Sequence, residues 1–177
     1  SEEAFISRYN SDLANDIGNL VNRSLTMVEK YFQGKIPQPG PQEKLDHLLF
    51  EKFQGFPAEI PPAIGRLEFQ SALISVWDFI GRANKYIEEA KPWALSKQGD
   101  TQRLGTVMYN LMESLRVIAI LISPFMPGTS LRIGEQLSCE KTPLQAGLAS
   151  AFRWGISKPG TMINKQPPLF PRIENKS

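Results

Sequence analysis

Two polar side chains on a predicted helix and one tryptophan beyond another are the first candidates for chemistry in this sequence. Asn19 and Arg23 are four positions apart, a spacing that places both on one face of an α-helix. Each carries paired hydrogen-bonding groups that match the edge of a nucleic-acid base. Trp93 follows Pro92, where another helix should stop, and an indole at a helix end can stack on an unpaired base. These three residues are candidates for reading RNA.

Each of these features also has a simpler interpretation. An asparagine and an arginine on one helix face commonly belong to a solvated surface. A Pro-Trp pair is commonly a core anchor whose indole N–H is bonded internally. Spacing alone therefore favours the simpler interpretation and leaves RNA reading as the alternative. If the residues do form a groove, Asn15, one turn before Asn19, would line it as well.

The remaining reactive side chains are few. The chain has one histidine, His47, and one cysteine, Cys139. They exclude an internal disulfide and every site that needs two His or Cys ligands, including a structural zinc. Glu43 and His47 alone are too few ligands for the di-metal centre of a helix bundle. No phosphate-binding glycine loop or other catalytic motif occurs. We therefore expect no catalytic residue, metal site or cofactor here, and a reducing, cytoplasmic location.

Composition and length limit the overall organisation. The 177 residues are 41% hydrophobic and 21% charged, with a formal net charge of +2, which suits one hydrophobic core and excludes a polycation. The longest aliphatic run, Val117–Ile122, is far shorter than the roughly 20 residues of a membrane span. No signal peptide is recognisable. We expect a single soluble domain over residues 1–177, with no membrane partner, cut from a longer protein.

Apolar residues recur with the helical period in five stretches, and no stretch before residue 140 alternates as a strand would. The predicted helices cover residues 3–32, 42–55, 63–89, 101–122 and 128–137. The fourth is apolar nearly all round in its last turns, as a central buried helix would be. We predict an all-α fold, an antiparallel bundle of about five helices over residues 1–140.

Two details of these helices are specific expectations. The proline-containing run from Phe56 to Pro62 should end the second helix, because proline lacks a backbone donor. The buried face of the third helix should include the positions that follow the helical period, which are Leu67, Ile74, Trp77, Ile80, Ala83 (or Asn84) and Ile87.

Residues 141–177 form a tail of a different kind. They contain five prolines and six basic residues against one acid, Glu174. The Pro-Gly pair at 159–160 is a candidate hairpin turn between residues 154–156 and 162–163. Pro168 to Ile173 should lie extended against apolar surface, because two prolines prevent a helix. We predict an irregular, Pro-rich basic tail.

Four segments resemble one known family. The first predicted helix contains Tyr9-Asn-Ser-Asp-Leu-Ala-Asn-Asp-Ile-Gly-Asn-Leu-Val-Asn-Arg23. This segment resembles the opening helix of the anticodon-binding domain of methionyl-tRNA synthetases, which are class I aminoacyl-tRNA synthetases. Residues 83–97 are similar to the Asn-x-Tyr…Pro-Trp box of that family, residues 113–127 to its fourth helix and Pro-x-x-Pro stop, and residues 168–174 to its domain end. Residues 33–68 carry no family motif.

The resemblance implies a role for the candidate residues. In the family, the matching asparagine and arginine contact anticodon bases, and the tryptophan stacks on the first anticodon base, a cytosine. The resemblance therefore implies that Asn19, Arg23 and Trp93 bind the anticodon of a methionine-specific tRNA. Asn15 is our addition and not a family residue.

The resemblance also implies what lies outside the chain. The His-x-Gly-His and Lys-Met-Ser-Lys-Ser motifs of the family do not occur here. A catalytic Rossmann domain that uses ATP and Mg²⁺ is therefore expected upstream, and this chain would recognise tRNA without catalysing the reaction. The basic residues Lys158, Lys165 and Arg172 would touch the tRNA backbone or pack against that domain.

Alternatives stay open at this point. The synthetases for Val, Leu, Ile and Cys have a similar helical domain, although Gly-Asn-Leu-x-Asn-Arg combined with Pro-Leu-Phe-Pro-Arg-Ile favours methionine. A stand-alone tRNA-binding module and a structural bundle that serves protein contacts are the other possibilities.

Overall fold

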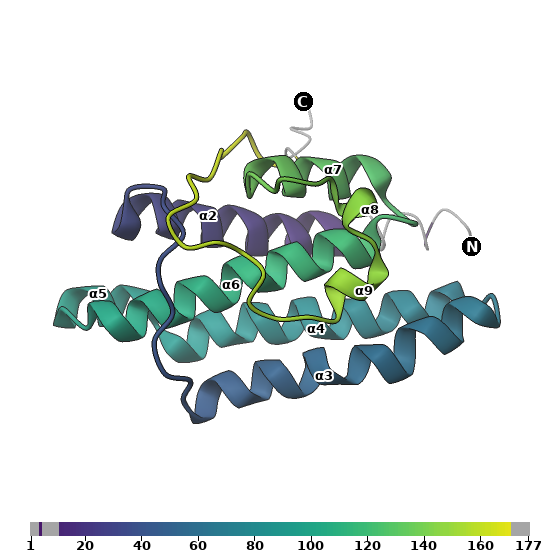
Figure 1. Ribbon diagram of the computed structural model, residues 1–177, viewed down its shortest axis with the longest axis horizontal. Coiled ribbons are helices and arrows are strands. Elements are labelled where there is room, and N and C mark those ends of the chain that lie inside the picture. The colour runs from purple at the N-terminus through teal and green to yellow at the C-terminus, as the bar shows by residue number, and fades with distance from the viewer. Residues whose placement is uncertain (1–3, 5–10, 171–177) are drawn as a thin grey trace.

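The described part of the chain is built from helices and connecting loops (Figure 1). The computed structural model describes residue 4 and residues 11–170. The elements are the π-helix η1 (Leu13–Ile17) and the α-helices α2 (Gly18–Phe32), α3 (Lys44–Gly65), α4 (Phe69–Ala90), α5 (Pro92–Gln98), α6 (Thr101–Ile122), α7 (Pro127–Gln136), α8 (Pro143–Ala146) and α9 (Leu148–Ala151). No β-strand occurs in residues 11–170, so the predicted all-α class is confirmed.

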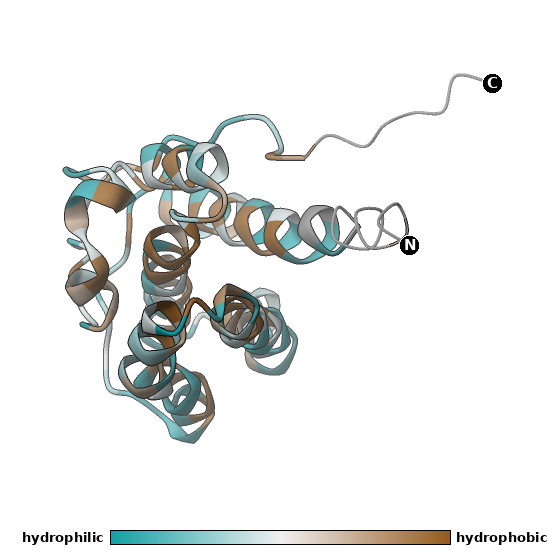
Figure 2. Ribbon diagram, turned by 90° about the vertical axis from the view of Figure 1, so that its right-hand side faces the viewer, coloured by the Kyte–Doolittle hydropathy of each residue, from teal (hydrophilic) through white to brown (hydrophobic). Residues whose placement is uncertain are grey.

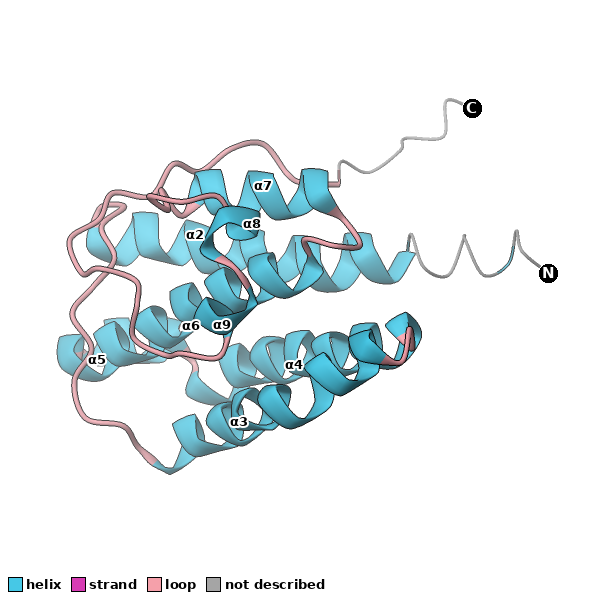
Figure 3. Cartoon of the chain, turned by 45° about the vertical axis from the view of Figure 1, so that its right-hand side comes forward, coloured by secondary structure: helices cyan, strands magenta, loops and turns pink. Residues whose placement is uncertain are grey.

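The long helices pack around α6. Helices α3 and α4 form an antiparallel hairpin, α6 runs back along α4, and α2, α7 and the single-turn helices α8 and α9 pack against α6 (Figures 1 and 3). Viewed along the helices, hydrophilic residues lie mainly on the outward sides (Figure 2). Every residue of α6 from Leu104 to Ile122 is buried. By length and composition α6 would also pass for a membrane span, but inside this bundle it is the core helix that the sequence predicted.

The predicted end of the second helix at Gly55 is wrong. Helix α3 continues through Pro57, Pro61 and Pro62 to Gly65. The three prolines lie on its exposed side, while Phe56 and Ile60 on the other side are buried against the core. The long contact with α4 therefore outweighs the backbone hydrogen bonds that the prolines remove.

The third predicted helix begins later than expected, and its buried face matches the prediction only in part. Helix α4 starts at Phe69, after a turn in which Leu67 has a positive φ of 59°. Leu67 and Ile74, which were expected in the core, are 73% and 55% exposed. Ile80, Ala83 and Ile87 are buried as expected. The buried stripe also includes Val76 and Phe79, because α4 is covered by α3 as well as by α6. The short helix α5 was not predicted at all.

The predicted hairpin within the tail does not form. Residues 160–163 instead pair with the segment that follows α2, through a bridge between Lys35 and Met162. The backbone N–H of Ile36 donates to the Thr161 carbonyl (2.9 Å), and that of Ile163 donates to the Gly34 carbonyl (2.8 Å). Residues 154–156 were the predicted partner strand. They do not pair with residues 162–163, because the backbone N–H groups of residues 155–157 are hydrogen-bonded to the Glu113 side chain.

A buried carboxylate on α6 holds that part of the tail. The Glu113 carboxylate accepts hydrogen bonds from three consecutive backbone N–H groups, those of Gly155 (2.7 Å), Ile156 (3.1 Å) and Ser157 (2.8 Å). Its other partner is Arg116, at 2.9 Å. Further along, Leu169 is buried, as the extended segment at Pro168 was expected to be; residues 171–177 lie outside the described part. The tail is therefore packed onto the bundle.

Candidate nucleic-acid interface

Asn19 and Arg23 lie on the outer side of α2. The opposite side of this helix packs into the core through Leu20, Val21, Leu25 and Val28. This arrangement follows from the apolar period of the helix, which leaves Asn19 exposed and the Arg23 side chain 35% exposed. Asn15, one turn earlier, is also exposed, and its amide donates to the Ser11 hydroxyl at 3.3 Å.

The beginning of this helical segment is fixed to α4 by polar contacts. The Trp77 indole N–H donates to the Asp16 carboxylate (3.2 Å), and the Asn84 amide donates to the Asp16 carbonyl (3.1 Å). Asp16 belongs to the π-helix η1, whose wider turn alters which carbonyl groups remain free for such bonds. The position of the Asn15 and Asn19 backbone is thereby set relative to α4.

An ion pair joins Arg23 to the last turns of α4. Arg23 Nη2 lies 2.6 Å from Glu88 Oε1, and the Glu88 side chain is 59% exposed. The sequence offered no indication of this partner, because the two residues are far apart in the chain. The guanidinium expected to meet RNA is therefore already paired in the free chain.

Trp93 stands just beyond the end of α4. Lys91 ends α4 with a left-handed backbone (φ 50°), and the buried Pro92 begins α5. Trp93 itself is 44% exposed. This exposure suits a stacking surface better than the core-anchor interpretation. Lys91 and Lys97, on either side of it, are exposed as well.

Arg23 and Trp93 are connected through the end of α4. Arg23 touches Glu88, and α4 leads from Glu88 directly to Trp93. Within residues 11–170, no hydrogen bond, ion pair or ring contact joins Trp93 to Asn19 or Arg23. That the three residues share one groove therefore stays a prediction.

A buried polar network that the sequence analysis did not predict joins α3, α4 and α6. Asp46, on the first turn of α3, is fully buried and accepts hydrogen bonds from the Tyr86 hydroxyl (2.5 Å), from Arg103 Nη1 (2.7 Å) and from the Glu43 N–H (2.7 Å). Burial alone would raise the pKa of Asp46, but the Arg103 guanidinium, the Glu43 N–H and the Tyr86 hydroxyl outweigh it and hold that pKa below its ordinary value. The carboxylate therefore stays ionised.

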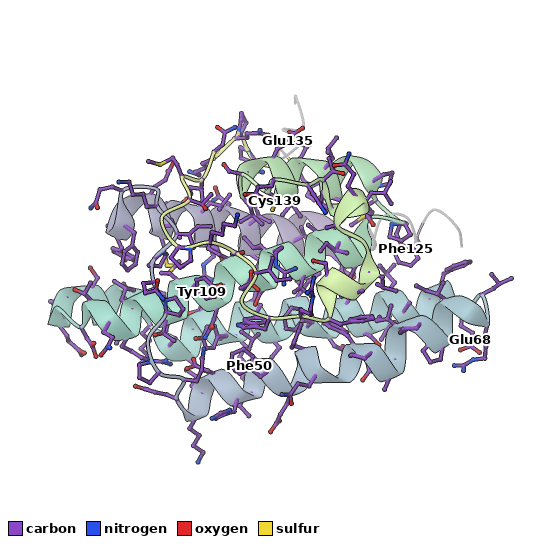
Figure 4. All side chains as sticks on the ribbon, viewed as in Figure 1. Phe50, Glu68, Tyr109, Phe125, Glu135 and Cys139 are labelled. Carbon is purple, nitrogen blue, oxygen red and sulfur yellow. The ribbon has the colours of Figure 1, made fainter. Side chains whose placement is uncertain are left out.

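One cavity in the described part lies away from these residues. It has a volume of about 300 Å³ and lies between α6 and the tail, with Arg116, Cys139 and Arg153 in its lining. Figure 4 shows Cys139 between α7 and the tail. None of Asn19, Arg23 and Trp93 lines it. A surface that binds an extended or looped polymer does not require an enclosed cavity. The exposed surface with Asn19, Arg23 and Trp93 is therefore the candidate interface.

The former candidates for metal or thiol chemistry are isolated. His47 is exposed, and Cys139 is a free cysteine. In the part of the chain that the structure describes, no group of three or more His, Cys, Asp or Glu side chains is placed to hold a metal ion.

Comparison with known proteins finds the same family by a family model and by individual relatives. The family model of the anticodon binding domain of methionyl tRNA ligase matches residues 36–177. The chain is 47% identical over 175 residues to a methionine–tRNA ligase of Caldanaerobacter subterraneus subsp. tengcongensis, and 40% identical over 176 residues to one of Thermotoga maritima. These alignments cover 98% and 99% of this chain but only 27% and 28% of the relatives.

Solved structures agree with the sequence comparison. The crystal structure of the apo form of Mycobacterium tuberculosis methionyl-tRNA synthetase superposes with a TM-score of 0.85 at 34% identity. The superposition covers 98% of this chain and 35% of that chain. Asn19 and Arg23 precede the family-model match, and they fall within the longer alignments that span nearly all of the sequence.

Proposed function

Because this chain belongs to the methionyl-tRNA ligase family, through the anticodon-binding domain of these enzymes, we propose that it recognises the anticodon for an enzyme that attaches methionine to its tRNA. The chain spans 27% and 28% of the length of the two ligases named above. We assign the reaction to the remainder, a Rossmann domain upstream of residue 1 that uses ATP and Mg²⁺ in the cytoplasm. Residues 1–177 would then act together as the recognition unit.

Each of the three residues has a distinct task in this proposal. Asn19 has both a donor and an acceptor, so it can match one base edge and reject another. Arg23 has donors only and pairs with acceptor atoms of a base. Trp93 supplies a flat surface on which the first anticodon base stacks. Stacking requires an exposed ring, and the Trp93 indole is exposed.

The observation that carries the proposal is the position of Arg23. It lies on the outer side of α2 next to Asn19, and its ion pair with Glu88 ties it to the helix that leads into Trp93. The polar surface on α2 and the stacking residue on α5 would then both lie next to the end of α4. The exposed Lys91 and Lys97 would add attraction for the phosphates.

A rigid bundle suits such a task. The anticodon is far from the end of tRNA that receives the amino acid, so reading it must be converted into correct placement of the other end. Long helices packed on a fully buried α6 give a support that does not bend easily.

The basic tail keeps its two interpretations. Lys158 is paired with Glu140 at 2.6 Å, and Lys165 lies 3.9 Å from Glu29. Arg172 lies outside the described residues. Contact with the tRNA backbone and packing against the catalytic domain both remain proposals for these lysines.

Binding of anticodon stem–loop RNA tests the proposed function. We would compare a stem–loop that carries the methionine anticodon CAU with one whose first anticodon base is changed. Asn19→Ala and Arg23→Ala should each weaken binding of the CAU stem–loop by about 1–3 kcal/mol and weaken the other much less. Asn22→Ala, an exposed neighbour on the same helix, is the control.

Two results would contradict the proposal. A wild-type chain that binds both stem–loops equally would exclude anticodon recognition. If instead Arg23→Ala weakened both equally and lowered the salt dependence by about one counterion, Arg23 would be a phosphate contact and not a reader of bases. The upstream sequence of the gene separates a ligase part from a stand-alone module.

A further inference from the structure

We infer that Asp46, Tyr86 and Arg103 are positioning residues for the anticodon site, because they fix the two helix ends between which α5, with Trp93, is held. The inference rests on the proposed function of Trp93. None of the three residues would touch RNA. They would act through the orientation of α5 alone.

Helix α5 has little stability of its own. It has seven residues, fewer than an isolated helix needs to form in water. Both of its ends have a left-handed backbone, at Lys91 (φ 50°) and at Gly99 (φ 75°). It packs chiefly against α6. Its Pro92 is buried, and its Leu95 packs against the hydrophobic core. The direction of the Trp93 indole therefore depends on how the end of α4 is placed relative to the start of α6.

The Asp46 network sets that placement. Tyr86 belongs to the last turns of α4 and Arg103 to the first turn of α6, and both bind the Asp46 carboxylate of α3. Arg103 donates two hydrogen bonds to this carboxylate, from Nη1 at 2.7 Å and from Nη2 at 3.0 Å. The Asn110 amide, also on α6, donates to the Tyr86 hydroxyl at 3.2 Å. Paired charge-assisted bonds have fixed directions, so they define the register of the two helices more narrowly than apolar packing does.

The chain contains a matched control for this network. Arg116 on α6 pairs with the fully buried Glu113, just as Arg103 pairs with the fully buried Asp46. The arginine side chains are 7% and 10% exposed. Arg116, however, also donates to the carbonyls of Ser150 and Arg153 in the tail, whereas Arg103 lies in the first turn of α6, next to α5. Arg103→Lys and Arg116→Lys are therefore the same chemical change at two buried pairs, of which only one flanks α5.

Hydrogen exchange tests the positioning without RNA. Arg103→Lys should speed the exchange of the amides of residues 94–99 by about tenfold, because α5 loses its fixed ends, while α7 keeps its wild-type rates. Arg116→Lys should leave residues 94–99 unchanged. If Arg103→Lys does not fold, Tyr86→Phe, which removes only the hydroxyl, takes its place. Wild-type exchange in residues 94–99 of the folded variant would overturn the inference.

A double-mutant cycle tests whether the network acts through Trp93. Arg103→Lys should weaken CAU stem–loop binding about three- to tenfold in the wild-type background, and less than about twofold when Trp93 is already alanine. An equal loss in both backgrounds, or an equal loss in Arg116→Lys, would show a merely structural role and overturn the inference. Failure of the proposed function is a different result, since the wild-type chain would then not distinguish the two stem–loops, and hydrogen exchange would still decide whether α5 is positioned by the network.

Discussion

Arg23 and Glu88 are held together at 2.6 Å across the contact between α2 and α4. An RNA base that uses the guanidinium must share it with the carboxylate or replace it. Because both side chains are partly exposed, the pair itself contributes only about 0–1 kcal/mol, and a well-matched base can displace it. The carboxylate would then face the RNA and repel any phosphate or acceptor atom that approaches without a good bond to Arg23.

This relationship predicts that Glu88→Gln strengthens RNA binding and reduces discrimination. The amide removes both the competition for Arg23 and the repulsion, so stem–loops with the wrong anticodon should gain more than the CAU stem–loop. We expect gains of about 0.5–1 kcal/mol for the former. Affinities for the two RNAs at constant salt check this.

The adjacent Glu89 is the control for net charge. It pairs with Arg82 and Lys85 on its own helix and not with Arg23. Glu89→Gln changes the charge by the same amount, and we expect it to leave the ratio of the two affinities as it is. If both variants lowered the ratio of the two affinities equally, the cause would be the net charge of the protein and not the ion pair between Arg23 and Glu88.

Trp93→Ala should weaken CAU stem–loop binding by about 1–3 kcal/mol, the usual loss for one base–aromatic stack. Because the indole is 44% exposed, the melting temperature should change little. Trp154→Ala should do the reverse, since that indole packs edge-on against Phe50 and Phe53, each at 4.9 Å between ring centroids. Thermal melts and binding isotherms of both variants separate the two effects; a large stability loss in Trp93→Ala would contradict the stacking role.

The stability of the chain should fall in acid partly through Glu113. Burial alone would raise the pKa of Glu113, but the Arg116 guanidinium and the Ser157 N–H outweigh it and hold that pKa below its ordinary value. A carboxyl with a lowered folded-state pKa stabilises the fold fully above its unfolded pKa of about 4.3, and this contribution is lost as the pH falls through the folded pKa.

Glu113→Gln removes this contribution. At pH 7 it should destabilise the fold by about 3–5 kcal/mol, because Arg116 is left buried without a counter-charge. Below the unfolded pKa the difference from wild type should shrink. The pKa of Asp46 is also lowered in the folded state, so the variant should still lose some stability in acid. Denaturant melts from pH 7 to pH 3 measure this, and a constant difference across that range would contradict it.

Two glycines should respond to alanine in opposite directions. A Cβ at Gly105 would lie 3.0 Å from the Gln38 carbonyl oxygen. That segment cannot move away easily, since the Gly40 N–H donates to the Thr106 hydroxyl at 2.7 Å. Gly105→Ala should therefore destabilise by about 1–2 kcal/mol despite its better helix propensity.

Gly81 is the matching case without a neighbour. A Cβ there meets nothing within 4 Å, and the residue lies within α4. Gly81→Ala should stabilise the fold by about 0.5–1 kcal/mol. Unfolding free energies of the two variants check the signs, and a gain in both would show that the segment at Gln38 yields.

The sequence predicted the long helices well because each has a continuous apolar period. It failed where the decisive contact is distant. The prolines of α3 suggested an end, and only the facing α4 explains why the helix continues. The turn at residues 159–160 was predicted correctly. Residue 162, which follows the turn, pairs with Lys35 and not with residues 154–156, because Glu113 accepts hydrogen bonds from the backbone of that segment. No local pattern announces such a bond.

The candidate site shows the same division. Asn19, Arg23 and Trp93 stand out by type, spacing and resemblance, and the exposure of Asn19 follows from the helical period. Glu88, Asp46 and Arg103 do not stand out, because their importance comes from partners on other helices.

The place of α6 in the chain affects how the protein is made. Helices α2 and α4 pack on α6, yet both precede it in synthesis. At about 5–20 residues per second, α2 leaves the ribosome several seconds before α6 is complete. In that interval α3 and α4 can already pack on each other, whereas α2 has its contact with α4 but lacks its contact with α6. A chaperone that shields nascent apolar helices would therefore act between the emergence of α2 and that of α6.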